Sequence, residues 1–161
     1  MTNLVVTLGQ PDAEAFAPYG RFLLPPAEPG SRLFYSDALD ARTEISAPVL
    51  HINHVIPVTL PIVAVKIERH PYAAQCFIPL DVSRYIVMVM PSDANGDPCP
   101  DQALSILMPA TTGVIYNPGT WHLGMTVVDR PAHFTVLMWR ENSPQDDEFR
   151  TIPAITIIAP T

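Results

Sequence analysis

The stretch IVAVKIERHPYAAQCFIPLDVSRYIVMVM, residues 62–90, decides the fold of this chain. It contains three runs of branched, aromatic and other apolar residues, which Pro71 and a polar Asp-Val-Ser segment separate. Short runs between turn-forming residues are typical of β-strands, because proline cannot continue a helix interior or a central strand. The stretch therefore predicts three consecutive strands at 62–70, 73–80 and 84–90.

The same pattern continues on both sides, because 19 prolines are scattered through the 161 residues. The runs between them predict four more strands, at 49–55, 103–109, 113–117 and 132–140. Many short strands joined by turns indicate an all-β barrel or sandwich. Asp12 is expected to cap one short N-terminal helix that ends before Pro18, and the apolar tail after Arg150 is expected to pack.

The composition predicts a single domain spanning residues 1–161. With 48% apolar residues the chain can build a core, whereas charged residues make up 16% and the formal net charge is −7. A charge-poor, acidic chain is not expected to bind nucleic acids or membranes, and a small anionic substrate needs a local cation. The start lacks a signal-peptide pattern, and Cys76 and Cys99 have no metal-type spacing. Both features predict a cytoplasmic protein in a reducing compartment.

Strand alternation predicts a polar face within residues 62–70. Side chains on a strand alternate between its two faces, so Lys66, Glu68 and His70 share one face. Arg69 belongs to the opposite face. An exposed strand face explains this pattern without any function. Inside a barrel, the same face would line a cavity together with Gln75 of the next strand.

A second histidine follows a tight turn. In the run YNPGTWHLGM, residues 116–125, an Asn-Pro-Gly-Thr turn precedes Trp121 and His122. A histidine that only caps the second strand of a hairpin is one explanation. In a closed barrel the turn instead brings His122 opposite His70, and two converging imidazoles predict a catalytic or binding site.

Two motifs resemble the ureidoglycolate lyase family, formerly called ureidoglycolate hydrolase. IERHPYAAQCFIPL (67–80) is similar to the family's E-R-H-P-x3-Q-x-F-I-P pattern, and GVIYNPGTWH (113–122) is similar to its G-V-x-Y-x-x-G-x-W-H pattern. The resemblance extends over residues 48–150. It implies a cupin-like antiparallel β-barrel and cleavage of ureidoglycolate into glyoxylate and urea in allantoin and purine breakdown. It also implies a dimer, a divalent metal (nickel in some members) and no organic cofactor.

The chain departs from the family pattern at two places. His54 stands where the family generally has arginine, and Leu123-Gly124-Met125 follows the Trp-His pair where the family generally has a histidine or a proline-rich step. Arginine binds carboxylates through two parallel hydrogen bonds, and histidine does not replace it. The alternative interpretations are therefore an enzyme for a different 2-hydroxy acid derivative, or a cupin-like protein that binds or senses a small acid.

Substrate chemistry suggests the role of each candidate residue. Ureidoglycolate carries a hydroxyl, a carboxylate and a urea nitrogen on one carbon, so its cleavage needs a base and an acid. The expected catalytic residues are His70, His122 and Tyr116, although a strand tyrosine at the barrel rim also fits Tyr116. If a divalent metal is present, its expected ligands are His70 and His122 with Gln75 or Glu68. Without a metal, the same histidines are expected to act directly as base and acid. The expected substrate-binding residues are Lys66, Gln75, Arg84, Trp121 and Arg140, with Trp121 as a wall or core residue.

Two further expectations concern the reaction and the assembly. An amidohydrolase route, which releases ammonia instead of urea, is the alternative chemistry. A chain with this much apolar β surface and few charges is expected to cover a strand face or edge by forming a homodimer.

Overall fold

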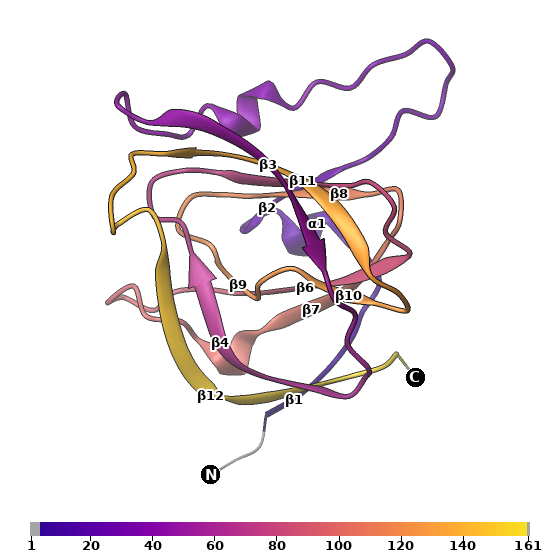
Figure 1. Cartoon of the computed structure of the whole chain (residues 1–161). Coiled ribbons are helices and arrows are strands. Elements are labelled where there is room, and N and C mark those ends of the chain that lie inside the picture. The colour runs from indigo at the N-terminus through magenta and orange to yellow at the C-terminus, as the bar shows by residue number, and fades with distance from the viewer. Residues whose placement is uncertain (1–3, 161) are drawn as a thin grey trace.

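The computed structural model describes residues 4–160, whose strands form two sheets that curl around a shared interior (Figure 1). The strands of the seven-stranded sheet lie in the order β1 (Leu4–Thr7), β12 (Glu148–Ile158), β4 (Ile62–Arg69), β9 (Trp121–His122), β6 (Arg84–Met90) and β10 (Thr126–Val128), with β7 (Leu104–Pro109) also paired to β6. The strands of the five-stranded sheet lie in the order β2 (Gly20–Leu23), β8 (Gly113–Tyr116), β5 (Gln75–Pro79), β11 (Ala132–Arg140) and β3 (Ala47–Val55). Apart from the parallel pair β1 and β12, the strand pairs are antiparallel. The all-β prediction is confirmed.

All seven strands predicted from the sequence are present, and their ends differ from the predicted ones by two residues or fewer. The patterns did not identify β1, β2, β9, β10 and β12. Four of these strands have four residues or fewer, too short for an alternation pattern. Pro153 interrupts the apolar pattern of β12, which is the predicted packed tail and pairs with β1 and β4.

The predicted N-terminal helix is confirmed as α1 (Ala13–Phe16). The carboxylate of Asp12 accepts hydrogen bonds from the backbone N–H groups of Glu14 and Ala15, which is an N-cap interaction. Phe16 is fully buried and stacks on Phe22, with ring centroids 4.5 Å apart. Two short 3-10 helices, η1 (Ser36–Leu39) and η2 (Pro100–Gln102), complete the helical structure of residues 4–160.

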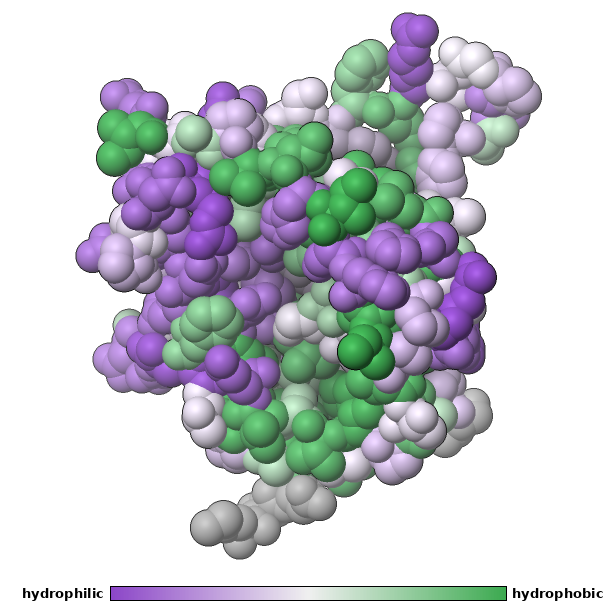
Figure 2. All heavy atoms as spheres, viewed as in Figure 1, coloured by the Kyte–Doolittle hydropathy of each residue, from purple (hydrophilic) through white to green (hydrophobic). Residues whose placement is uncertain are grey.

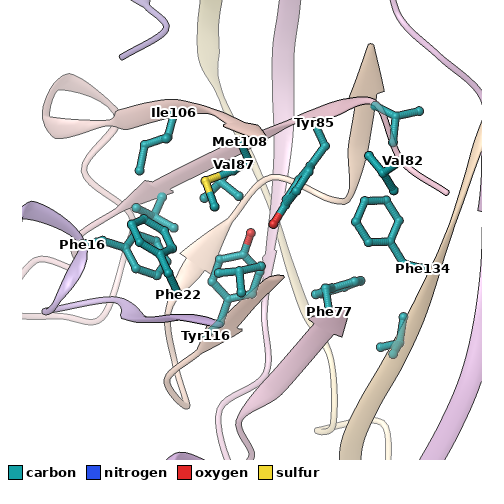
Figure 3. Close-up of a cluster of buried hydrophobic side chains, with 14 of the residues drawn as sticks. Phe16, Phe22, Phe77, Val82, Tyr85, Val87, Ile106, Met108, Tyr116 and Phe134 are labelled. Carbon is teal, nitrogen blue, oxygen red and sulfur yellow. The ribbon is translucent and has the colours of Figure 1, made fainter. Parts of the chain in front are cut away.

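Strand β6 is buried on both faces, which explains its unbroken apolar run. Tyr85 and Val87 belong to the core between the two sheets, where Phe77, Tyr116 and Phe134 also pack (Figure 3). The alternate residues of β6 belong to a second core on the opposite face of the seven-stranded sheet, together with Trp121, Ile67 and side chains of β12. The candidate site lies at the edge of the first core, next to Tyr116.

The outer face of the five-stranded sheet is rich in exposed apolar side chains. Leu50 is 69% exposed and Ile52 is 63% exposed on β3, and Ile78 and Leu80 extend this surface from β5. Figure 2 shows apolar side chains along the β3 side of the molecule, interrupted by polar ones. In the described residues, no helix is long and apolar enough to cross a membrane.

Candidate functional site

Three side chains that the sequence singled out meet inside the fold. Glu68 of β4 and His122 of β9 are directly opposite each other in the ladder, and His70 follows one residue after the end of β4. One ligand atom from each of the three residues lies within 4.8 Å of the others. The rings of His70 and His122 have centroids 5.5 Å apart. We call these three residues the buried cluster.

In both histidines of the buried cluster, Nδ1 faces hydrogen-bond acceptors. Nδ1 of His122 lies 2.8 Å from the backbone carbonyl oxygen of Thr120. Nδ1 of His70 lies 3.1 Å from the carbonyl oxygen of Asp146 and 2.9 Å from Oδ1 of Asp147. In each ring Nδ1 has the nearer acceptor and so carries the proton, which leaves the free lone pair of the neutral ring on Nε2.

The two Nε2 atoms are buried and point into the cluster. Among residues 4–160, neither finds a hydrogen-bond partner, although Nε2 of His122 lies 3.5 Å from Oε1 of Glu68. Buried polar atoms normally have a partner, so two such nitrogens beside a carboxylate fit a bound ligand. Two imidazoles and one carboxylate, each imidazole held through its other nitrogen, form a donor set that suits a divalent transition metal.

The charge states of the cluster also favour metal binding at neutral pH. Burial lowers the pKa of His70, and the nearby His122 lowers it further. For Glu68, burial alone would raise the pKa, but the hydrogen bond with His122 and the charges of His122, His70 and Lys66 together lower it overall. Neutral imidazole and ionised carboxylate are the forms that bind a metal.

Tyr116 and Gln75 lie beside the cluster on the opposite sheet. The ring of Tyr116 stacks on His122 with centroids 4.2 Å apart and an angle of 17° between the ring planes. Burial raises the pKa of Tyr116, and the charge of Glu68 adds to this, so the phenol stays protonated. Figure 3 shows its hydroxyl directed into the aromatic core. Gln75 is opposite Tyr116 in the β5–β8 ladder, and its buried Oε1 has no partner in the described part of the chain.

Arg140 reaches the cluster indirectly, through Asp147. Its Nη1 donates a hydrogen bond of 3.1 Å to Oδ1 of Asp147, and its Nη2 contacts Oδ2 of the same carboxylate. Asp147 in turn contacts His70. Sequence reasoning missed Asp146 and Asp147: the two adjacent acids are visible in the sequence, but nothing in the sequence relates them to His70.

Lys66 lines a pocket beside the cluster, and Glu68 is the member of the cluster that this pocket reaches. A pocket of about 230 Å³ is lined by Lys66, Ile67, Glu68, Gly124 and Phe149. The Lys66 ammonium lies over the Phe149 ring, 4.4 Å from its centroid. The pocket therefore has a cation at one side and the carboxylate of Glu68 at the other.

Two predicted substrate-binding residues lie away from the cluster. Arg84 forms two hydrogen bonds with the carboxylate of Asp129, at 2.9 and 2.7 Å, and lines a different, exposed pocket. Trp121 is fully buried in the second core, and Arg69 lies over its ring, 4.3 Å from the centroid. Of its two expected roles, Trp121 therefore occupies the core position.

His54, where the chain departs from the family pattern, lies on the outer face of the five-stranded sheet. It pairs with His133 in the β3–β11 ladder, and the two rings stack with centroids 4.2 Å apart. Because alternate residues face opposite sides, these rings point away from the interior that Met138 and Arg140 face. The departure at His54 therefore changes the outer surface and leaves the buried cluster intact.

Comparisons with known proteins agree with the sequence motifs. The family model described as ureidoglycolate lyase matches residues 5–157. A ureidoglycolate lyase of Burkholderia cepacia is 31% identical over 147 residues, which cover 84% of this chain and 80% of that protein. A ureidoglycolate lyase of Mesorhizobium japonicum is 26% identical over 157 residues, covering 91% and 93%. Among solved structures, a dTDP sugar isomerase of Desulfovibrio desulfuricans has a TM-score of 0.51 at 15% identity, covering 84% and 83%, which supports a cupin-like fold.

Proposed function

The chain belongs to the ureidoglycolate lyase family, and from this premise we propose that it cleaves ureidoglycolate into glyoxylate and urea at the buried cluster. The observation that carries the proposal is the pair of buried Nε2 atoms of His70 and His122, which face the carboxylate of Glu68. A purely structural barrel would not need three polar groups converging at a buried position. The family consists of carbon–nitrogen lyases, and elimination is the chemistry that this site can support.

The elimination moves one proton and needs no water. Removal of the hydroxyl proton lets the oxygen electrons form the carbonyl of glyoxylate while the carbon–nitrogen bond breaks. The same proton then goes to the departing nitrogen and completes urea. In the absence of a metal, Nε2 of His70 or of His122 is the acceptor for this proton, because imidazole exchanges protons near neutral pH. Tyr116 holds the His122 ring by stacking, and we propose it as a secondary candidate for proton donation.

A divalent metal fits the same residues. Glu68, His70 and His122 would hold it, and we propose nickel as its identity on the strength of the family resemblance. A bound divalent ion would acidify the substrate hydroxyl and help to hold the carboxylate. Gln75, with its buried Oε1 beside Tyr116, is a candidate for a further ligand or for a contact to the ureido N–H groups.

We propose that Lys66 receives the substrate carboxylate. Its ammonium lines the pocket next to Glu68, whose volume of about 230 Å³ is ample for a substrate of nine heavy atoms. Arg140 is a poorer candidate, because Asp147 already occupies both terminal nitrogens of its guanidinium. Arg84 and Trp121 are not part of this proposal, because they lie elsewhere in the fold.

A product assay tests the proposed reaction. Purified protein is incubated with each enantiomer of ureidoglycolate, and glyoxylate, urea and ammonia are measured at the end point. Equal amounts of glyoxylate and urea are expected. Ammonia without urea would instead show the amidohydrolase route, and a ligand-induced rise in melting temperature without turnover would show a sensor.

We also propose that two copies pair through the outer face of the five-stranded sheet. Leu50, Ile52, Ile78 and Leu80 share this face and are each 44% exposed or more. Exposed apolar side chains that gather on one face are typical of protein interfaces, and a two-fold dimer is the commonest assembly that covers such a face.

A further inference from the structure

We propose that Asp147 is the positioning residue for His70. Its carboxylate, held by Arg140, keeps the imidazole proton of His70 on Nδ1 and so leaves the Nε2 lone pair directed into the buried cluster. The geometric part of this inference is independent of the substrate. Only its kinetic consequence rests on the proposed function.

The atoms around Nδ1 of His70 show which nitrogen of this ring carries the proton. Oδ1 of Asp147 lies 2.9 Å from this nitrogen, and the carbonyl oxygen of Asp146 lies 3.1 Å from it. Both neighbours are acceptors, and an N–H group satisfies them whereas a bare lone pair would be repelled by both. Since a neutral imidazole has one N–H, its Nε2 must then carry the lone pair.

The carboxylate of Asp147 is itself fixed in place. Arg140 approaches it with Nη1 at 3.1 Å from Oδ1 and with Nη2 against Oδ2, so the two groups form a fork-to-fork pair. The side chain of the preceding residue, Asp146, accepts hydrogen bonds from the backbone N–H groups of Glu141 and Ser143. These contacts hold the turn between β11 and β12, from which Asp147 reaches His70.

The charge of Asp147 adds to its position. A carboxylate at Nδ1 strengthens Nε2 as a donor of electrons to a metal. The same carboxylate neutralises Arg140, so that the positive charge of the guanidinium does not weaken this donor. Arg140 thus acts on the cluster through Asp147.

An amide at position 147 should disturb this arrangement less than a methyl group. Oδ1 of Asp147 faces both Nδ1 of His70 and Nη1 of Arg140, so an amide oxygen in that place in Asp147→Asn accepts from both, and the amide N–H₂ group faces Nη2 of Arg140 alone. Asp147→Asn therefore keeps an acceptor at Nδ1 and loses the negative charge. Asp147→Ala loses both, and its unpaired Arg140 disfavours an N–H group on Nδ1, where only the carbonyl oxygen of Asp146 still accepts.

The test uses three variants of the full chain: Asp147→Asn, Asp147→Ala and Asp129→Asn. Asp129 provides the matched control, because it also forms a two-pronged pair with an arginine, Arg84, but far from the cluster. Nitrogen-15 NMR of the metal-free proteins, labelled at histidine, reports which nitrogen of His70 carries the proton. Competition with a chelator measures the affinity for Ni²⁺, and the steady-state kcat is measured with ureidoglycolate.

The wild type and Asp147→Asn should carry the His70 proton on Nδ1, and Asp147→Ala should carry part of it on Nε2. Asp147→Ala should lose about 10- to 100-fold in Ni²⁺ affinity and kcat, the usual range for groups behind a metal ligand, and Asp147→Asn should lose less. Asp129→Asn should match the wild type in all three measurements. A wild type with the proton on Nε2 overturns the inference even if no variant folds. An Asp147→Ala protein that equals or exceeds Asp147→Asn in affinity and kcat also overturns it. If the wild type does not cleave ureidoglycolate, the proposed function fails, while the proton position and the Ni²⁺ affinity still decide this inference.

Discussion

Glu68 and His122 stand directly opposite each other in the β4–β9 ladder, with Oε1 and Nε2 3.5 Å apart. Strand β9 has two residues, and its pairing on both sides, with β4 and with β6, fixes the His122 side chain. The carboxylate and the imidazole are therefore placed by backbone hydrogen bonds before any ligand binds. Because these side chains are already ordered, ligand binding does not incur the conformational-entropy cost of ordering them.

Glu68→Gln is expected to lower turnover by at least about 10²-fold and to weaken Ni²⁺ binding. Glutamine keeps the shape of the side chain but removes the negative charge that a divalent ion and the protonated histidine both require. Steady-state kinetics and a chelator competition measure the two effects. Glu28→Gln, on an exposed loop, is the control. Unchanged Ni²⁺ affinity in folded Glu68→Gln would remove Glu68 from the ligand set.

Lys66→Met is expected to raise KM for ureidoglycolate by about 10- to 100-fold. This factor corresponds to the free energy lost with one hydrogen bond to a charged group. Methionine retains the apolar stem that packs near Phe149 but cannot bind a carboxylate. Lys66→Arg should recover most of the affinity, because it restores the charge. A KM for Lys66→Met within twofold of the wild type would show that the substrate carboxylate binds elsewhere.

The ion pair of Arg84 and Asp129 should make stability depend on acid pH. Hydrogen bonds from Arg84 and Ser83 lower the pKa of Asp129 from 3.8 to about 2. A lowered pKa in the folded state means that the stabilisation is present above pH 3.8 and is lost as the pH falls toward 2. The difference in unfolding free energy between the wild type and Asp129→Asn should therefore shrink over this range in denaturant titrations. Asparagine tolerates the positive φ of 72° at this position. A constant difference would contradict the assignment.

Replacing an apolar residue on the outer sheet face should dissociate the proposed dimer. Ile52→Glu places a charge in the centre of the surface that Leu50 and Ile78 extend. Light scattering at micromolar concentration should give a dimer mass for the wild type and a monomer mass for the variant. Val63→Glu, an exposed position on the other sheet, should remain dimeric. A monomeric wild type would refute the proposal.

Much of the fold could be predicted from the sequence because its signals are local. Prolines and short branched runs mark seven strands, and the Asp12 cap marks the helix. β6 illustrates what pattern reading leaves open: its unbroken apolar run identifies a strand, but the core on each face comes from β12 and β11, distant in sequence. The β9 strand has two residues and exists because its neighbours supply the pairing.

Part of the candidate site could be predicted from the sequence, and part could not. Alternation along β4 placed Glu68 and His70 on one face, and this placement agrees with the structure. Asp147 could not be assigned, because its relation to His70 depends on the turn between β11 and β12, and a sequence pattern does not specify that turn. From the sequence, Arg84 and Arg140 were both candidates for binding the substrate carboxylate. In the tertiary structure each already forms an ion pair, Arg84 with Asp129 and Arg140 with Asp147.

The central claim is that the buried cluster performs the cleavage, and the turnover of His122→Ala tests it most directly. His54→Ala is the matched control, since that histidine is exposed on the outer sheet face. The kcat for ureidoglycolate should fall by at least about 10²-fold in His122→Ala, the lower end of general acid–base effects, and stay at the wild-type value in His54→Ala. Circular dichroism should show that both variants keep the β fold. A folded His122→Ala protein with near wild-type turnover would contradict the claim.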